Sequence, residues 1–69
     1  MTDTDDAALT ARRALAMDVV AWVKRWKTWT RDHNEARAYS AAMAELNANP
    51  NLPKFEVARI AINAAQPGR

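Results

Sequence analysis

The sequence predicts an all-α domain in which one long N-terminal helix is followed by two shorter helices. Apolar residues recur at helical spacing in three segments, no proline occurs before Pro50, and the only glycine is Gly68. The chain has 69 residues and no cysteine, and a single core of this size is marginal without a disulfide or a metal ion. Association of two copies would supply the missing stability. We therefore predict a helical homodimer.

The first helix is predicted over residues 4–30. Its largest apolar side chains are spaced alternately by four and three residues, which places them on one face of a helix. We expect this stripe to lie in the core or in the dimer contact, and it consists of Leu15, Val19, Trp22, Trp26 and Trp29. A second apolar row beside it consists of Leu9, Ala16, Val20 and Val23.

The second and third helices are predicted over residues 34–47 and 53–66, joined by a turn over residues 47–53. Asp32 and Glu35 are spaced as a capping box that would begin the second helix. Asparagine and proline dominate the turn, and both favour leaving a helix. Apolar residues also alternate partly over residues 55–62, which leaves a strand there as an alternative. All three helices belong to one domain, residues 1–69.

Composition argues against several classes of function. The formal net charge is +2, which is too small to imply a nucleic-acid partner by itself. The start of the chain is polar and acidic, and charged residues interrupt every apolar run, so we expect a cytoplasmic protein without a membrane span. Ser40 and His33 are the only serine and the only histidine, and no catalytic motif is present. We expect no enzyme, no catalytic residue, no metal site and no cofactor.

Residues 24–31 mix tryptophans with lysines and arginines, which admits three interpretations. The segment could bind single-stranded nucleic acid, lie on a membrane surface, or pack its tryptophans inward as part of the apolar stripe. The heptad spacing separates Trp22, Trp26 and Trp29, which would face inward, from Lys24, Lys27 and Arg31. That separation favours the structural interpretation, and we expect neither direct nucleic-acid binding nor membrane binding.

The second helix is the predicted binding surface for a protein partner. Tyr39 is its one large aromatic residue, and tyrosine often dominates the energetics of interfaces. Acidic side chains around Tyr39 would complement a basic surface. The predicted contact residues are Tyr39, Glu35, Ala38, Ala42, Met43 and Glu45. Packing of Tyr39 in the core, with Met43 and Leu46, is the equally weighted alternative.

Three stretches of the chain resemble a family of small phage proteins. The run from Asp5 to Leu15, the segment WVKRWKTW at residues 22–29 and the segment EARAYSAAMAEL at residues 35–46 are similar to the quorum-sensing anti-activators of Mu-like phages of pseudomonads. The resemblance extends over essentially the whole chain. It rests on the sequence as a whole and not on a diagnostic motif.

The resemblance implies a non-enzymatic inhibitor that acts in the cytoplasm of the infected bacterial host. Its implied partner is the DNA-binding domain of a LuxR-type quorum-sensing activator, which it would prevent from binding DNA. A second implied partner is the assembly ATPase of type IV pili, whose inhibition would stop twitching and exclude further phages. The positive net charge departs from a simple DNA mimic, so any mimicry should be local. The alternative function is a small DNA-binding transcriptional regulator of the phage.

Overall fold

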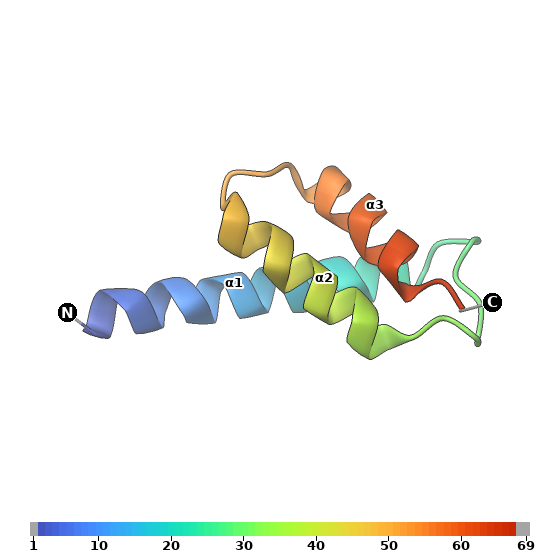
Figure 1. Ribbon diagram of the computed structural model, residues 1–69, viewed down its shortest axis with the longest axis horizontal. Helices are drawn as coiled ribbons and strands as arrows, with labels where there is room; N and C mark the ends of the chain where they lie inside the picture. The colour runs from blue at the N-terminus through green and yellow to red at the C-terminus, as the bar shows by residue number, and fades with distance from the viewer. Residues whose placement is uncertain (1, 68–69) are drawn as a thin grey trace.

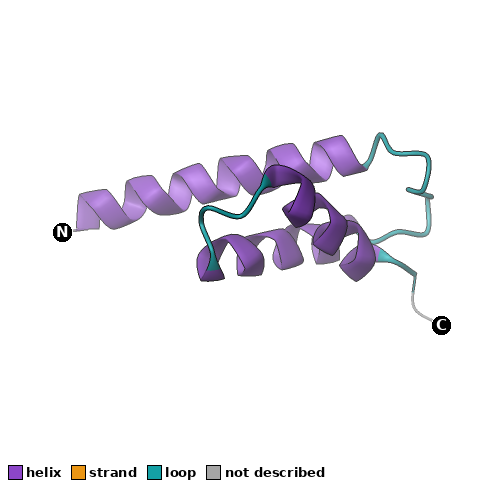
Figure 2. Ribbon diagram, turned by 90° about the horizontal axis from the view of Figure 1, so that it is seen from above, coloured by secondary structure: helices purple, strands orange, loops and turns teal. Residues whose placement is uncertain are grey.

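The computed structural model describes residues 2–67, with side chains described from residue 6 onward, and contains three helices. Helix α1 is Thr2–Val23, α2 is Glu35–Ala48 and α3 is Lys54–Ala65. Helices α2 and α3 pack on each other and on the C-terminal part of α1, whereas the N-terminal part of α1 extends beyond them (Figures 1 and 2). The described residues contain no strand, so the alternative of a strand over residues 55–62 is wrong.

Helix α1 ends at Val23, seven residues before its predicted end at residue 30. The chain continues in tight turns, in which the Arg25 N–H donates to the Trp22 carbonyl and the Trp26 N–H donates to the Val23 carbonyl, both at 3.0 Å. These turns bring the Trp26 ring to within 6.1 Å of the Phe55 ring on α3. Tertiary packing therefore ends a helix that no glycine or proline marks in the sequence.

The start of α2 is fixed by Asn34 and not by the predicted capping box. The Asn34 side chain accepts a hydrogen bond from the Arg37 backbone N–H at 3.1 Å, while the Asp32 N–H donates to the Thr30 hydroxyl at 3.3 Å. The Asn34 N–H also donates to the Ala65 carbonyl at 2.8 Å. This bond joins the beginning of α2 to the end of α3, so the position of the first turn of α2 is well defined.

The core is built largely from small residues, which allow the three helices to approach closely. Val19 is the one member of the predicted α1 stripe that is fully buried; Leu15, Trp26 and Trp29 pack against the edge of the core, and Trp22 is 37% exposed. Ala16, Val20 and Val23 of the second row are buried together with Val19, at the spacing i, i+3, i+4 and i+7 of a helix that packs on two neighbours, whereas Leu9 is only partly buried. The buried side chains are Ala16, Val19, Val20, Val23, Ala38, Ala42, Leu46, Val57, Ala58, Ala61, Ile62 and Ala65.

The described helices lack the features of a membrane span and of a metal site. None of them is both long enough and apolar enough to cross a bilayer. Among the side chains described, residues 6–67, no three histidines, cysteines, aspartates or glutamates gather as a metal ion would require.

Candidate protein-interaction site

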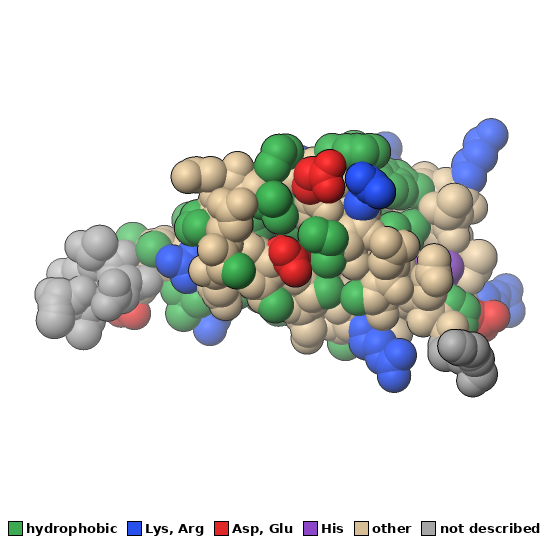
Figure 3. All heavy atoms as spheres, turned by 45° about the horizontal axis from the view of Figure 1, so that its top comes forward, with side chains coloured by type: hydrophobic (Ala, Val, Ile, Leu, Met, Phe, Trp, Pro, Cys, Tyr) green, Lys and Arg blue, Asp and Glu red, His purple; other side chains and the backbone are tan. Residues whose placement is uncertain are grey.

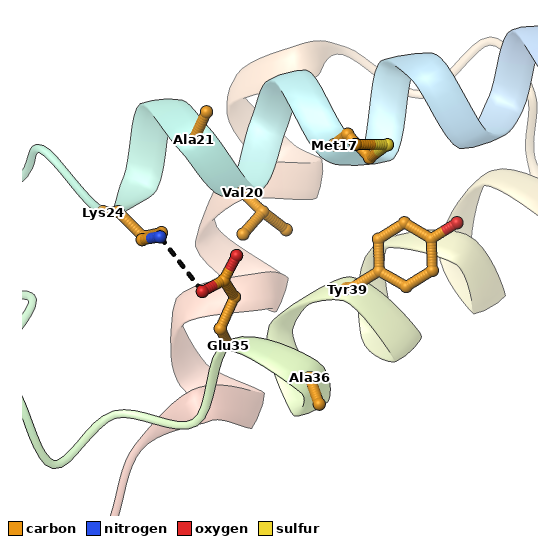
Figure 4. A pocket seen from close by; sticks show the side chains of 7 residues that line it. All are labelled: Met17, Val20, Ala21, Lys24, Glu35, Ala36 and Tyr39. Atoms are coloured by element: carbon orange, nitrogen blue, oxygen red, sulfur yellow. Dashed lines mark hydrogen bonds and ion pairs between the residues drawn. The ribbon is translucent and has the colours of Figure 1, made fainter.

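A groove runs between the C-terminal part of α1 and the N-terminal part of α2 (Figure 4). Its volume is about 710 Å³, and its lining is mainly apolar with one charged pair at one end. We call it the Tyr39 groove. The residues that line it are Met17, Val20, Ala21, Lys24, Glu35, Ala36 and Tyr39.

Tyr39 and Met17 form the apolar end of the Tyr39 groove. Tyr39 is half-buried, since one side of it packs against the core while its ring borders the groove opposite Met17 (Figure 4). The Met17 side chain is 63% exposed, which is high for a large apolar residue. A flexible thioether beside a fixed aromatic ring can adapt to an apolar side chain of a partner. Tyr39 therefore has a dual position, partly in the core and partly at the surface.

Glu35 and Lys24 form the charged end of the Tyr39 groove. The Lys24 Nζ lies 3.0 Å from the Glu35 Oε1, and the two side chains are 42% and 61% exposed. An ion pair this exposed contributes at most about 1 kcal/mol to stability, because water and salt screen it. The Glu35 carboxylate is consequently exposed and only weakly engaged by its partner.

The structure brings together only part of the predicted contact set. Tyr39 and Glu35 both line the groove, and Met43 follows Tyr39 by one turn and is half-buried against the core. Ala38 and Ala42 are fully buried, so their prediction as partner contacts is wrong. Alanine fits a tight contact between helices as readily as an exposed face. In α2 these two alanines face the core.

Glu45 does not line the Tyr39 groove. It follows Tyr39 by six residues, which corresponds to about 120° around a helix. Around the helix axis, the buried residues Ala38, Ala42 and Leu46 lie between Tyr39 and Glu45. Of the two carboxylates only Glu35 lines the groove, and the role of Glu45 as a partner contact stays a prediction.

Sequence reasoning missed the half of the groove that comes from α1. Met17, Ala21 and Lys24 are spaced i, i+4 and i+7, so they form a row beside the buried Val20. The spacing was visible in the sequence. The row mixes an apolar, a small and a charged residue, so it does not appear as an apolar stripe in the sequence.

A second surface lies where α1 ends beside the beginning of α3. Trp22 and Trp26 meet edge to face with 5.3 Å between ring centres, and Phe55 lies 6.4 Å and 6.1 Å from the two tryptophans. We call these three residues the aromatic cluster. Phe55 is 54% exposed, and the Lys54 ammonium lies 5.6 Å from the centre of the Trp22 ring. The large rings therefore pack mainly on one another and on a neighbouring cation.

The tryptophans and cations of residues 24–31 are separated, but not by a heptad. Trp26 and Trp29 are half-buried against the core, and the Trp29 ring lies 4.8 Å from the His33 ring. Lys27 and Arg31 are exposed. The structural interpretation thus holds for Trp26 and Trp29 but not for Trp22, which is 37% exposed, and the continuous helix from which it was predicted ends at Val23.

Comparison of the chain with protein-family models, with curated proteins and with solved structures gave no match. No residue of the groove therefore takes its role from a related protein. The roles proposed below follow from the chain's own geometry and from the resemblance noted in its sequence.

Proposed function

We propose that this chain is a non-enzymatic inhibitor that binds the DNA-binding domain of a LuxR-type quorum-sensing activator and blocks its access to DNA. The observation that carries the proposal is the position of Tyr39, which borders an open apolar groove with the Glu35 carboxylate at its other end. A DNA-reading surface is basic and also presents apolar side chains, so both ends of the groove would find a complement.

The interface would have Tyr39 as its anchor. Tyrosine buries a large apolar ring at a low cost in conformational entropy, and such residues dominate many interfaces. Its half-buried position supports this role, because the packed side of the ring fixes its orientation before binding. Met17 would adapt to the partner, and Glu35 would set the register by pairing with a basic residue.

The aromatic cluster supports the proposed homodimer. Trp22 and Phe55 are large apolar side chains at the surface of a chain of only 69 residues, and a second copy would cover them. In such a dimer the two Tyr39 grooves would remain free, because Met17 and Trp22 lie about 140° apart around α1. The proposed site of action is the cytoplasm of the infected host, and inhibition of the type IV pilus assembly ATPase is a second proposed activity.

A small DNA-binding regulator is the second candidate function. The exposed cations Arg25, Lys27 and Arg31, in the connection after α1, favour it. Contacts from these residues to phosphates would make the affinity of the chain for DNA fall steeply with salt. A mainly apolar contact around Tyr39 would respond less, so salt dependence separates the two functions.

The test uses fluorescence anisotropy of labelled operator DNA bound to the purified DNA-binding domain of a LuxR-type activator. Addition of the wild-type chain should release the DNA, Tyr39→Ala should fail to release it at the same concentration, and Tyr39→Phe, which keeps the ring, should retain most of the inhibition. An increase in anisotropy with the chain and DNA alone would instead support the DNA-binding regulator.

A further inference from the structure

The charged end of the Tyr39 groove already contains a cation of the chain itself. Lys24 pairs with Glu35 at the mouth of the groove, with its Nζ 3.0 Å from the Oε1 (Figure 4). We propose that Lys24 is a built-in competitor for Glu35, and that the groove selects partners whose arginine displaces Lys24 while an apolar side chain one helical turn away contacts Tyr39. This inference rests on the proposed function and specifies the chemistry of the partner.

The two members of the pair differ in how firmly the fold holds them. Glu35 is the first residue of α2, where the Asn34 cap and the bond from Asn34 to the Ala65 carbonyl define the backbone. Lys24 is the first residue after α1 and reaches Glu35 at the end of a flexible four-carbon stem. Lys24 can therefore move away without a change in the fold, because its side chain is exposed and the pair contributes little to stability.

An arginine is the cation best suited to replace Lys24. The lysine ammonium contacts one carboxylate oxygen, Oε1, as a point charge. A guanidinium can engage both carboxylate oxygens through two parallel hydrogen bonds, and it is less strongly hydrated than an ammonium group. Exchange thus replaces a weak, exposed pair with a bidentate pair that the interface shields from water.

The spacing of the groove residues specifies the rest of the partner. Glu35 and Tyr39 are four residues apart on α2, which places them on the same face about one turn apart. Met17 lies opposite Tyr39 on α1 (Figure 4). A partner helix that carries an arginine and an apolar residue three or four positions apart would contact Glu35 with the first and the Tyr39–Met17 end of the groove with the second.

The competition predicts that removal of Lys24 strengthens binding. Lys24→Met should bind the activator's DNA-binding domain about fivefold more tightly in isothermal titration calorimetry, which corresponds to about 1 kcal/mol. Lys27→Met is the matched control, since it removes the same charge from an exposed residue outside the groove lining. Its affinity should change by less than about twofold at 0.15 M salt, because screening weakens contributions from distant charges.

The dependence on Glu35 makes the test specific. In a Glu35→Gln background, Lys24→Met should give no further gain in affinity, because Lys24 and the partner's arginine no longer have a carboxylate for which to compete. Lys24→Met affinity equal to or weaker than that of the wild type would overturn the competition, and so would an equal gain in both backgrounds. Far-ultraviolet circular dichroism should be unchanged in all variants, since both side chains are exposed.

A second probe separates failure of this inference from failure of the proposed function. We would titrate a synthetic helical peptide with leucine and arginine four residues apart into the ¹⁵N-labelled chain, wild type and Lys24→Met. Tighter peptide binding by Lys24→Met, with shifts at Glu35 and Tyr39, would support the inference even if the activator's domain did not bind, and only the proposed function would then fall. Absence of peptide binding at the groove would overturn the inference, whatever the activator's domain does.

Discussion

The Tyr39 groove and the aromatic cluster lie on opposite sides of the buried residues of α1. They differ in whether their large side chains contact one another. In the aromatic cluster, Trp22, Trp26 and Phe55 contact one another, and Lys54 lies over one ring. In the groove, Tyr39 and Met17 stand on either side of an open space (Figure 4). The groove therefore leaves room for a partner side chain between its two walls, whereas the aromatic cluster can be covered only from outside, as in the proposed homodimer.

The space-filling view shows how apolar and charged side chains are distributed over one face of the molecule (Figure 3). Apolar side chains are interspersed with acidic and basic ones over the visible face, and they do not form one continuous patch (Figure 3). An interface on such a surface depends on a few well-placed anchors and not on total apolar area. Substitutions in the two regions should differ in the size of their effects on stability, partner binding and self-association.

The largest effect should come from the aromatic cluster and should be on stability. Trp26→Ala should lower the free energy of unfolding by about 2–3 kcal/mol in urea denaturation, somewhat less than for a fully buried tryptophan, because Trp26 is half-buried. Met17→Ala, in the groove, should cost less than about 1 kcal/mol because its side chain is 63% exposed. Equal losses in the two variants would remove the contrast between the regions.

The next effect should come from Tyr39 and should be on binding. Tyr39→Ala should weaken binding of the activator's DNA-binding domain about 30-fold, equivalent to about 2 kcal/mol, in isothermal titration calorimetry. Its helicity and self-association should be retained. If the loss of binding were accompanied by general unfolding, Tyr39 would be a core residue and not an anchor.

Phe55 should affect self-association more than folding. Phe55→Ser should raise the dissociation constant of the homodimer about tenfold in sedimentation equilibrium, because it removes an exposed apolar ring from the aromatic cluster. Binding of the activator's domain per chain should be unchanged. A dimer that is insensitive to Phe55→Ser would place the contact between copies elsewhere, for example on the N-terminal part of α1.

The smallest effect distinguishes two carboxylates on the same helix. Glu35→Gln should weaken binding of the activator's domain about fivefold, whereas Glu45→Gln, which makes the same change outside the groove, should leave the affinity within about twofold. Surface plasmon resonance at matched salt would measure both. The reverse ranking would move the interface to the other flank of α2.

The sequence was sufficient for the number and order of the helices and for the approximate bounds of α2 and α3, because apolar spacing and the proline-rich turn between them are local signals. The end of α1 could not be predicted in the same way, since contacts of Trp26 with Phe55, far along the chain, decide it. Ala38 and Ala42 were ambiguous because alanine has no strong preference between a tight helix contact and a surface. The separation of Glu45 from Tyr39 around α2 follows from their spacing of six residues and needs no tertiary contact.

The most direct test of the central claim is to map the bound face by nuclear magnetic resonance. The ¹⁵N-labelled chain would be titrated with the unlabelled DNA-binding domain of a LuxR-type activator, and the backbone shifts would be followed residue by residue. If the partner binds the Tyr39 groove, the largest changes should occur at Met17, Ala36 and Tyr39, and those at Trp22 and Phe55 should be small. Changes confined to Trp22 and Phe55, or no changes at any residue, would contradict it.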